Sequence, residues 1–138
     1  MPTAATASAL PSTVNLNGKN LTLQQVIAVA CHQAKVTIDT SNLAPALDFI
    51  NKAVANKKVV YGVTTGFGSK VDTSIDATDA LELQVNLLRS HACGVGEPFS
   101  EAIVRAIMVI RLNTLLIGHS GVQQTTVQQL AFLLNHNI

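Results

Sequence analysis

The segment from Glu101 to Ile117 constrains the fold most, because apolar residues lie on nearly every face of the helix that it predicts. Ser100 is its expected N-cap, and "GHSG" ends it. A helix of this kind is stable only where other helices cover most of its surface. Arg105 and Arg111 interrupt the apolar run, and we expect them to pair with carboxylates or to reach water with their charged ends. They also make the segment too short and too polar to span a membrane.

The rest of the chain predicts further helices and one extended segment. Val14 and Leu16 alternate with polar residues before an Asn17-Gly18 turn, which predicts a small hairpin or a short extended segment. The expected helices run from a Thr22 cap through Ala34, from a Ser41 cap past Pro45, from about Asp76 to His91, and from Thr125 to Leu134. The fold class is therefore mainly α. We expect residues 1–12 to form a disordered arm and residues 13–138 one helical segment.

The composition suggests that much of the apolar surface meets other protein. Hydrophobic residues make up 48% of the chain and charged residues only 12%, against about 25% charged in typical domains. We therefore expect self-association. The formal net charge is +1 and the basic residues are scattered, which disfavours nucleic acid and anionic membranes as partners. Without a recognisable signal peptide, the cytoplasm is the expected location.

Histidine and cysteine spacing predicts no metal site, because no pair of these residues stands at a recognisable short ligand spacing. The residues considered are His32, His91, His119, His136, Cys31 and Cys93. The two cysteines lie far apart, and we expect each to be a buried, reduced thiol.

The stretch "VVYGVTTGFGS" contains Tyr61, the only tyrosine of the chain, beside several glycines. Two interpretations remain open from the residues alone. Tyr61 is a core residue with one hydrogen bond, or an acid/base group whose ionised form is stabilised by its surroundings. The glycines predict a flexible loop, and its spacing does not fit a phosphate cradle. Ser90 and His91 close a helix before "CGVGEP", where His91 suits the helix dipole or projects into a cleft.

Three motifs together resemble one family. "VVYGVTTGFGS", "LQVNLLRSHACGVGEPFS" and "RLNTLLIGHSGV", in this order, resemble the N-terminal part of the aromatic amino-acid ammonia-lyase and histidase family from Val14 to Ile138. The resemblance implies the N-terminal portion of the ammonia-lyase helical fold with a glycine-rich lid loop. It implies non-oxidative elimination of ammonia from L-tyrosine or L-phenylalanine, giving a cinnamate-type acid of phenylpropanoid chemistry, by a cytoplasmic homotetramer.

The resemblance also implies a cofactor and site residues. The electrophile 4-methylidene-imidazole-5-one (MIO) forms from an Ala-Ser-Gly triplet, which these 138 residues lack; we expect the chain alone to be inactive. Tyr61 would be the catalytic residue that takes a β-proton, and the backbone of Gly68 would lie near the substrate amine. Ser90 and His91 would be the substrate-selectivity pair, and His91 disfavours a strict phenylalanine enzyme. Thr64, where histidases usually read asparagine, favours an aromatic substrate.

Several alternatives remain. The same motifs also resemble those of a histidine ammonia-lyase and those of a tyrosine 2,3-aminomutase. The chain ends at "LLNHNI", before the place of the triplet, so we expect either a segment of a complete enzyme or a noncatalytic, stand-alone helical domain.

Overall fold

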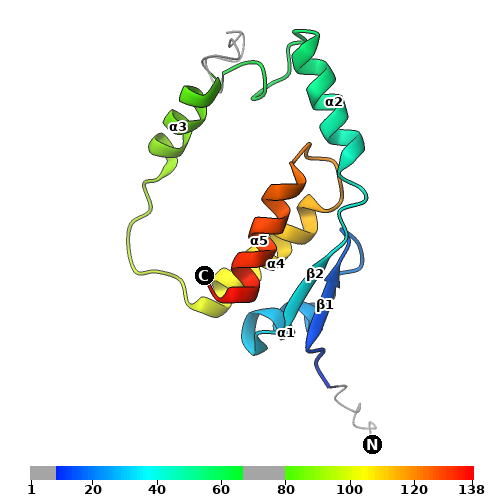
Figure 1. Ribbon diagram of the computed structural model, residues 1–138. Helices are drawn as coiled ribbons and strands as arrows, with labels where there is room; N and C mark the ends of the chain where they lie inside the picture. Colours follow the sequence, from blue (N-terminus) through cyan, green and yellow to red (C-terminus); the bar gives the residue numbers. More distant parts are fainter. Residues whose placement is uncertain (1–8, 67–79) are drawn as a thin grey trace, which may run out of the picture. The chain divides into compact units, whose positions relative to one another are not determined.

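The computed structural model describes residues 9–66 and 80–138. The chain falls into two compact units, one formed by residues 1–46 with 99–138 and the other by residues 47–98. The described residues are mainly helical, with one short sheet (Figure 1), which confirms the predicted fold class.

The first unit opens with a strand, a helix and a second strand. Strand β1 (Thr13–Leu16) precedes helix α1 (Leu23–His32) and strand β2 (Lys35–Ile38). The two strands pair in parallel, with Val14 opposite Val36. The predicted extended segment is therefore confirmed, whereas the hairpin alternative is wrong. A hairpin requires an antiparallel return, and here a whole helix lies between the paired strands.

Helix α1 begins where the sequence predicts. The Thr22 hydroxyl accepts a hydrogen bond from the Gln25 amide, and the Gln25 side chain accepts one from the Thr22 amide, which forms a capping box. The helix ends earlier than the predicted Ala34, because Gln33 takes a left-handed conformation with φ 55°. Its buried residues are Ala28, Val29 and Ala30.

Helices α4 (Glu101–Leu115) and α5 (Gln124–His136) complete the first unit (Figure 1). Helix α4 packs against both α1 and α5, and this confirms that neighbouring helices cover it. The cover is partial within this chain, since Ile103, Ile107 and Ile110 are about half exposed. Ser100 precedes α4 with an extended backbone, but its hydroxyl makes no capping hydrogen bond.

One hydrophobic core joins these elements. It contains the inward residues of both strands, of α1, α4 and α5, and of the segment before α2 (Ala44–Ala55). Its fully buried large side chains are Val14, Leu16, Val29, Val109, Leu112, Leu116, Val127 and Leu134.

Two glycines allow loops to approach the backbone closely. Gly18 has φ +81°, and a Cβ there would lie 2.6 Å from the Ile117 nitrogen. Gly118 has φ +86°, and a Cβ there would lie 2.2 Å from the Asn42 carbonyl oxygen. Both positions therefore need glycine for conformation and for space.

The second unit contains most of α2 and helix α3 (Ala80–His91). Ser41 does not cap α2, which starts at Ala44 with Pro45 in its first turn. The Ser41 amide instead donates to the Asp39 carboxylate, which forms a local turn ahead of the helix. The predicted end of α3 at His91 is confirmed, while its predicted start at Asp76 lies outside the described residues.

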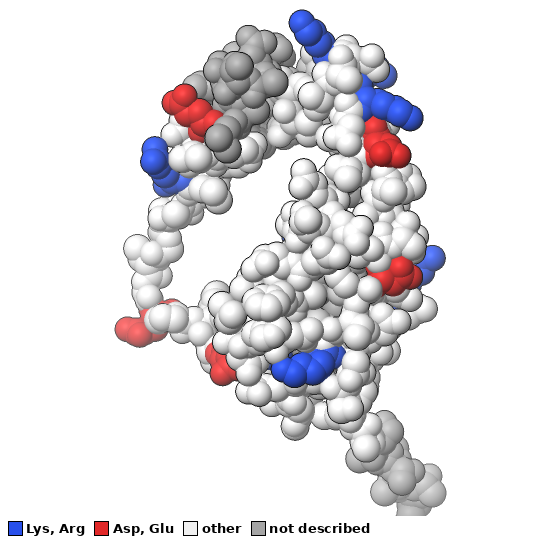
Figure 2. Space-filling model, viewed as in Figure 1, with Lys and Arg blue, Asp and Glu red and all other residues white. Residues whose placement is uncertain are grey.

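Charged side chains are sparse on the face shown in Figure 2, where they stand singly or in small mixed groups. Among the described residues, no helix combines the length and the apolarity needed to cross a membrane.

Candidate functional site

Tyr61 lies in a tight turn that follows α2. Residues 61–64 form the turn, and Gly62 takes φ +70° within it. The predicted extended run over residues 59–61 forms no strand, and Tyr61 already belongs to the turn. Tyr61 is 60% exposed. The interpretation of Tyr61 as a core residue is therefore wrong for this chain.

Threonine hydroxyls hold this turn. The Val60 amide donates to Thr64 Oγ1 at 2.8 Å, and Thr64 Oγ1 donates to the Lys58 carbonyl oxygen at 2.6 Å. The amides of Val63 and Thr64 both donate to the Val60 carbonyl oxygen at 3.0 Å. The turn is thus closed by side-chain and backbone bonds together.

Thr65 bonds to the residue that follows Tyr61 in the chain. Its hydroxyl accepts a hydrogen bond from the Gly62 amide at 3.3 Å and donates to the Gly66 carbonyl oxygen at 3.1 Å. Thr65 is 1% exposed, one of two buried polar or charged residues among those described. The sequence did not indicate this role of Thr65, although hydroxyl side chains near glycine turns often bond to local backbone.

His91 and Ser90 lie in the last turn of α3. His91 Nδ1 is 2.9 Å from the Leu87 carbonyl oxygen and 3.0 Å from Ser90 Oγ, and the Ser90 hydroxyl donates to the same carbonyl at 2.9 Å. A carbonyl oxygen only accepts, so the contact with Leu87 is a hydrogen bond in the tautomer that carries its proton on Nδ1. In the neutral ring, Nε2 is then an acceptor.

The His91 ring borders an open, mostly apolar hollow of about 540 Å³, lined also by Leu87, Leu88 and Ala92. An apolar surface beside one hydrogen-bond acceptor suits a ring that carries one polar donor. His91 and Arg89 in this last turn also complement the dipole of α3.

The predicted site residues fall on separate elements of one unit. Tyr61 follows α2, while Ser90 and His91 end α3, and all three belong to residues 47–98. Gly68, the other predicted catalytic residue, lies outside the described residues, as does most of the predicted lid loop. The roles of Tyr61, Gly68, Ser90 and His91 remain predictions.

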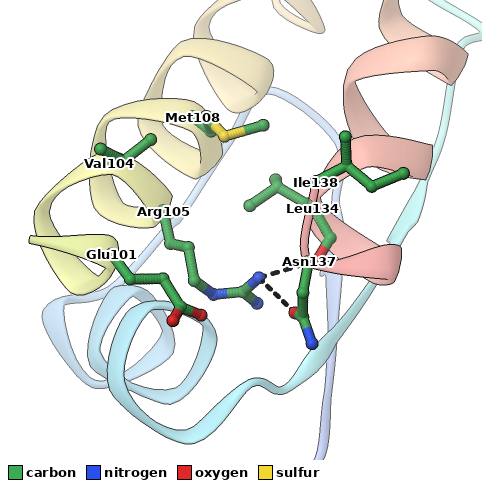
Figure 3. A pocket seen from close by; sticks show the side chains of 7 residues that line it. All are labelled: Glu101, Val104, Arg105, Met108, Leu134, Asn137 and Ile138. Carbon is green, nitrogen blue, oxygen red and sulfur yellow. Dashed lines mark hydrogen bonds between the residues drawn. The ribbon is translucent and has the colours of Figure 1, made fainter.

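A second cavity, of about 170 Å³, lies between α4 and the end of α5 (Figure 3). Arg105 is 4% exposed at its edge. Its guanidinium donates to the carbonyl oxygens of Val29 and Leu134 and to Asn137 Oδ1, at 3.0, 2.8 and 2.8 Å. These partners differ from the predicted carboxylate or water. The hydrogen bonds give Arg105 a structural role that the sequence did not indicate.

The cysteines differ from the prediction. Cys31 and Cys93 are both free and exposed. Cys31 comes directly after the three buried residues of α1, and Cys93 lies in an exposed segment beyond α3. Over residues 9–66 and 80–138, no group of three or more His, Cys, Asp or Glu side chains is placed to hold a metal ion.

Comparisons with known proteins converge on one family. The family model described as "Aromatic amino acid lyase" matches residues 21–138. A curated relative, the histidine ammonia-lyase of Streptococcus gordonii, is 47% identical over 128 residues, which cover 91% of this chain and 25% of that protein. This chain thus spans about a quarter of the length of the curated relatives that it matches.

Solved structures agree on the fold. The tyrosine aminomutase from Streptomyces globisporus matches with a TM-score of 0.85 and 37% identity, over 91% of this chain and 24% of that one. The ergothionase from Treponema denticola matches with a TM-score of 0.87 and 32% identity, over 91% of this chain and 26% of that one. With the family model matching most of its length, the chain belongs to the aromatic amino acid lyase family.

Proposed function

We propose that this chain is the N-terminal segment of an ammonia-lyase and that it contributes the proton-accepting Tyr61 and the ring-recognising His91. The observation that carries the proposal is the exposure of Tyr61 on a turn in which threonine hydroxyls bond to the residues before and after it. A general base must be held within reach of its proton and must be accessible to the substrate. The exposure of Tyr61 supports the second requirement, and the hydrogen bonds that fix its turn support the first.

In this proposal, Tyr61 accepts a proton from the β-carbon of the amino acid while the amino group departs. A phenol needs stabilisation of its ionised form to act in this way near neutral pH. MIO, when present, supplies the electrophile that activates the substrate. Its precursor triplet is not among these 138 residues, so another segment or chain must supply it. The exposure of Tyr61 fits such an arrangement.

His91 favours a substrate whose ring donates a hydrogen bond. Its Nδ1 bonds to the α3 backbone, which leaves Nε2 as the acceptor in the neutral imidazole. The hydroxyl of tyrosine and the ring N–H of histidine are both donors, whereas the phenyl ring of phenylalanine has none. We therefore propose tyrosine or histidine as the substrate, in preference to phenylalanine.

Aminomutase activity is the second candidate. The similarity to a tyrosine aminomutase, with a TM-score of 0.85, supports it as much as the similarity to histidine ammonia-lyases supports the lyase reaction. The two reactions share removal of the β-proton and differ in whether ammonia is added back at the β-carbon.

We also propose that the complete enzyme is a cytoplasmic homo-oligomer, a tetramer by resemblance to its family. The half-exposed isoleucines of α4 support burial against other protein.

A segment exchange tests the proposed function. This chain would replace the matching N-terminal region of the Streptococcus gordonii histidine ammonia-lyase and, separately, of the Streptomyces globisporus tyrosine aminomutase. Products from histidine, tyrosine and phenylalanine would be quantified by chromatography, which separates acrylic acids from β-amino acids. We expect turnover in at least one exchange protein.

Tyr61→Phe is the decisive variant, because it removes only the ionisable oxygen. We expect it to lower kcat by about a hundredfold or more while the protein keeps its assembly state. An exchange protein that turns over equally fast with phenylalanine at position 61 contradicts the proposal. The unexchanged enzymes are the controls for assay and assembly.

A further inference from the structure

We propose that Thr64 is a positioning residue for Tyr61, which acts on the backbone of the turn and does not read the substrate. The inference rests on the proposed function in one respect, the proton-transfer role of Tyr61. Its structural part stands on the hydrogen bonds of the turn alone.

The Thr64 hydroxyl uses its hydrogen-bonding capacity on the turn. Its single proton goes to the Lys58 carbonyl oxygen at 2.6 Å, since the Val60 carbonyl oxygen is farther away at 3.5 Å. It accepts from the Val60 amide at 2.8 Å. A hydroxyl has one donor and two acceptor positions, so one lone pair is left. Thr64 is also only partly exposed.

These bonds act directly beside Tyr61. Val60 precedes Tyr61 in the chain, and its amide is fixed by Thr64. Gly62 follows Tyr61, and its amide is fixed by the buried Thr65 at 3.3 Å. Both residues next to Tyr61 in the chain therefore donate a hydrogen bond to a threonine hydroxyl, and the two threonines are consecutive. We call the two threonines of "YGVTT", Thr64 and Thr65, the hydroxyl brace, because their hydroxyls bond to the backbone on both sides of Tyr61.

The brace replaces the support that a helix or strand would give. Residues 58–60 belong to no helix or strand, and Val59 is largely exposed, so core packing does not locate this part of the chain. A displacement of a catalytic group by about 1 Å lowers turnover about a hundredfold. Loss of the Thr64 hydroxyl should therefore displace Tyr61, because Thr64 fixes the amide of Val60, the residue before Tyr61.

The same contacts bear on substrate preference. A hydroxyl whose proton is committed to Lys58 cannot donate to a substrate ring, and its one remaining lone pair would accept from a tyrosine hydroxyl and from a histidine N–H alike, so Thr64 is no indicator of an aromatic substrate. An asparagine carries both an acceptor oxygen and a donor nitrogen, so it can serve the same two backbone groups. We therefore expect position 64 to accept threonine or asparagine, because either side chain can bond to the Val60 amide and to the Lys58 carbonyl oxygen.

A spectroscopic test uses the 138-residue chain itself. It has one tyrosine and no tryptophan, so its intrinsic fluorescence reports Tyr61 alone. For Thr64→Val we expect a lower fluorescence anisotropy and stronger acrylamide quenching than in the unsubstituted chain, and we expect Thr64→Ser to restore both. Thr114→Val is the matched control, because the Thr114 hydroxyl bonds to the Ile110 carbonyl oxygen of its own helix. Unchanged anisotropy and quenching in Thr64→Val would overturn the inference.

The kinetic test uses the exchange protein. We expect Thr64→Val to lower kcat about ten- to a hundredfold with little change in KM, and Thr64→Ser to recover most of the loss. Thr64→Asn should keep the ratio of kcat/KM for tyrosine and histidine within about threefold. A shift of that ratio beyond tenfold would mean that residue 64 contacts the substrate, against the inference.

The two proposals fail in different ways. Full turnover in Tyr61→Phe refutes the proposed function, and the fluorescence experiment still decides whether Thr64 positions the turn. Lost turnover in Tyr61→Phe together with unchanged fluorescence and kcat in Thr64→Val refutes the positioning role alone.

Discussion

The guanidinium of Arg105 donates to the carbonyl oxygen of Val29 at 3.0 Å, across 76 residues of sequence. The same side chain donates to Leu134 and Asn137 at the end of α5 (Figure 3). One buried cation therefore joins the C-terminal parts of α1 and α5 to α4. The carbonyl ends of helices carry partial negative charge, so they offset the charge of Arg105 where no carboxylate ion pair is recorded among the described residues.

Replacing Arg105 should destabilise the first unit strongly. Arg105→Ala leaves two buried carbonyl acceptors and the partly buried Asn137 Oδ1 without their donor, and hydrogen bonds to charged groups contribute about 1.5–3 kcal/mol each. We expect a loss of at least about 3 kcal/mol in the free energy of unfolding, measured by urea denaturation. Arg105→Lys should recover only part of the lost stability, because the lysine ammonium lacks the planar, forked arrangement of N–H donors of the guanidinium. Arg111→Ala, at an exposed position of the same helix, is the control with a change within about 0.5 kcal/mol.

Gly118 should tolerate no side chain. An alanine there combines a left-handed backbone with a Cβ only 2.2 Å from the Asn42 carbonyl oxygen. We expect Gly118→Ala to lower the free energy of unfolding by about 3 kcal/mol or more, with a matching fall in Tm by calorimetry. Gly94→Ala is the control, since a Cβ at Gly94 meets nothing within 4 Å. Equal Tm values in the two variants would contradict the close packing of the Gly118 loop.

Local signals in the sequence predicted helix positions well and strand pairing poorly. The capping box of Thr22 and Gln25 is readable within four residues, and α1 begins there. Strand β2 has only four residues, and its partner β1 lies on the far side of a helix. Parallel pairing of this kind depends on tertiary packing, so the Asn17-Gly18 turn wrongly suggested a hairpin.

Asn135 protects the outer edge of β2. Its side chain accepts from the Val36 amide at 2.8 Å and donates to the Val36 carbonyl oxygen at 2.9 Å, as a neighbouring strand would. Asn135→Leu should leave both backbone groups unpaired, at a cost of about 1–3 kcal/mol. Hydrogen exchange provides the local measurement: the Val36 amide should exchange faster in the variant. The Lys35 amide, which bonds to Ser12 on the β1 side, should change less.

The turn after β2 should show a weak pH dependence in acid. Hydrogen bonds from the Ser41 backbone, and then from its side chain, hold the pKa of Asp39 below its ordinary value of 3.8. A lowered folded-state pKa means that the contribution is present above the unfolded pKa and is lost as pH falls through the folded value. Asp39 is fully exposed, so the effect is small. Carboxyl chemical shifts in an NMR titration should give the lowered pKa, and Ser41→Pro, which removes both donors, should return it toward 3.8.

For the candidate site, the sequence predicted the residues but could not predict their surroundings. Tyr61 alone was as consistent with a core position as with an acid/base role, and its exposure decided against the core. The hydroxyl brace of Thr64 and Thr65 depends on the exact course of one turn. Composition and periodicity carry no information about such a turn, although a pair of threonines after a glycine is compatible with it.

His91→Phe tests whether the imidazole selects the substrate. In the exchange protein we expect the preference, as the ratio of kcat/KM values, to move toward phenylalanine. The reason is that the variant removes the Nε2 acceptor for a ring donor and adds an apolar surface beside Leu87 and Leu88. A site built to pair a polar group rejects analogues that lack it by large factors, so we expect a change of about tenfold or more. Ser90→Ala is the companion variant, since Ser90 Oγ lies 3.0 Å from Nδ1 and helps to orient the ring; it should lower turnover without reversing the preference. An unchanged preference in His91→Phe would show that His91 only ends its helix.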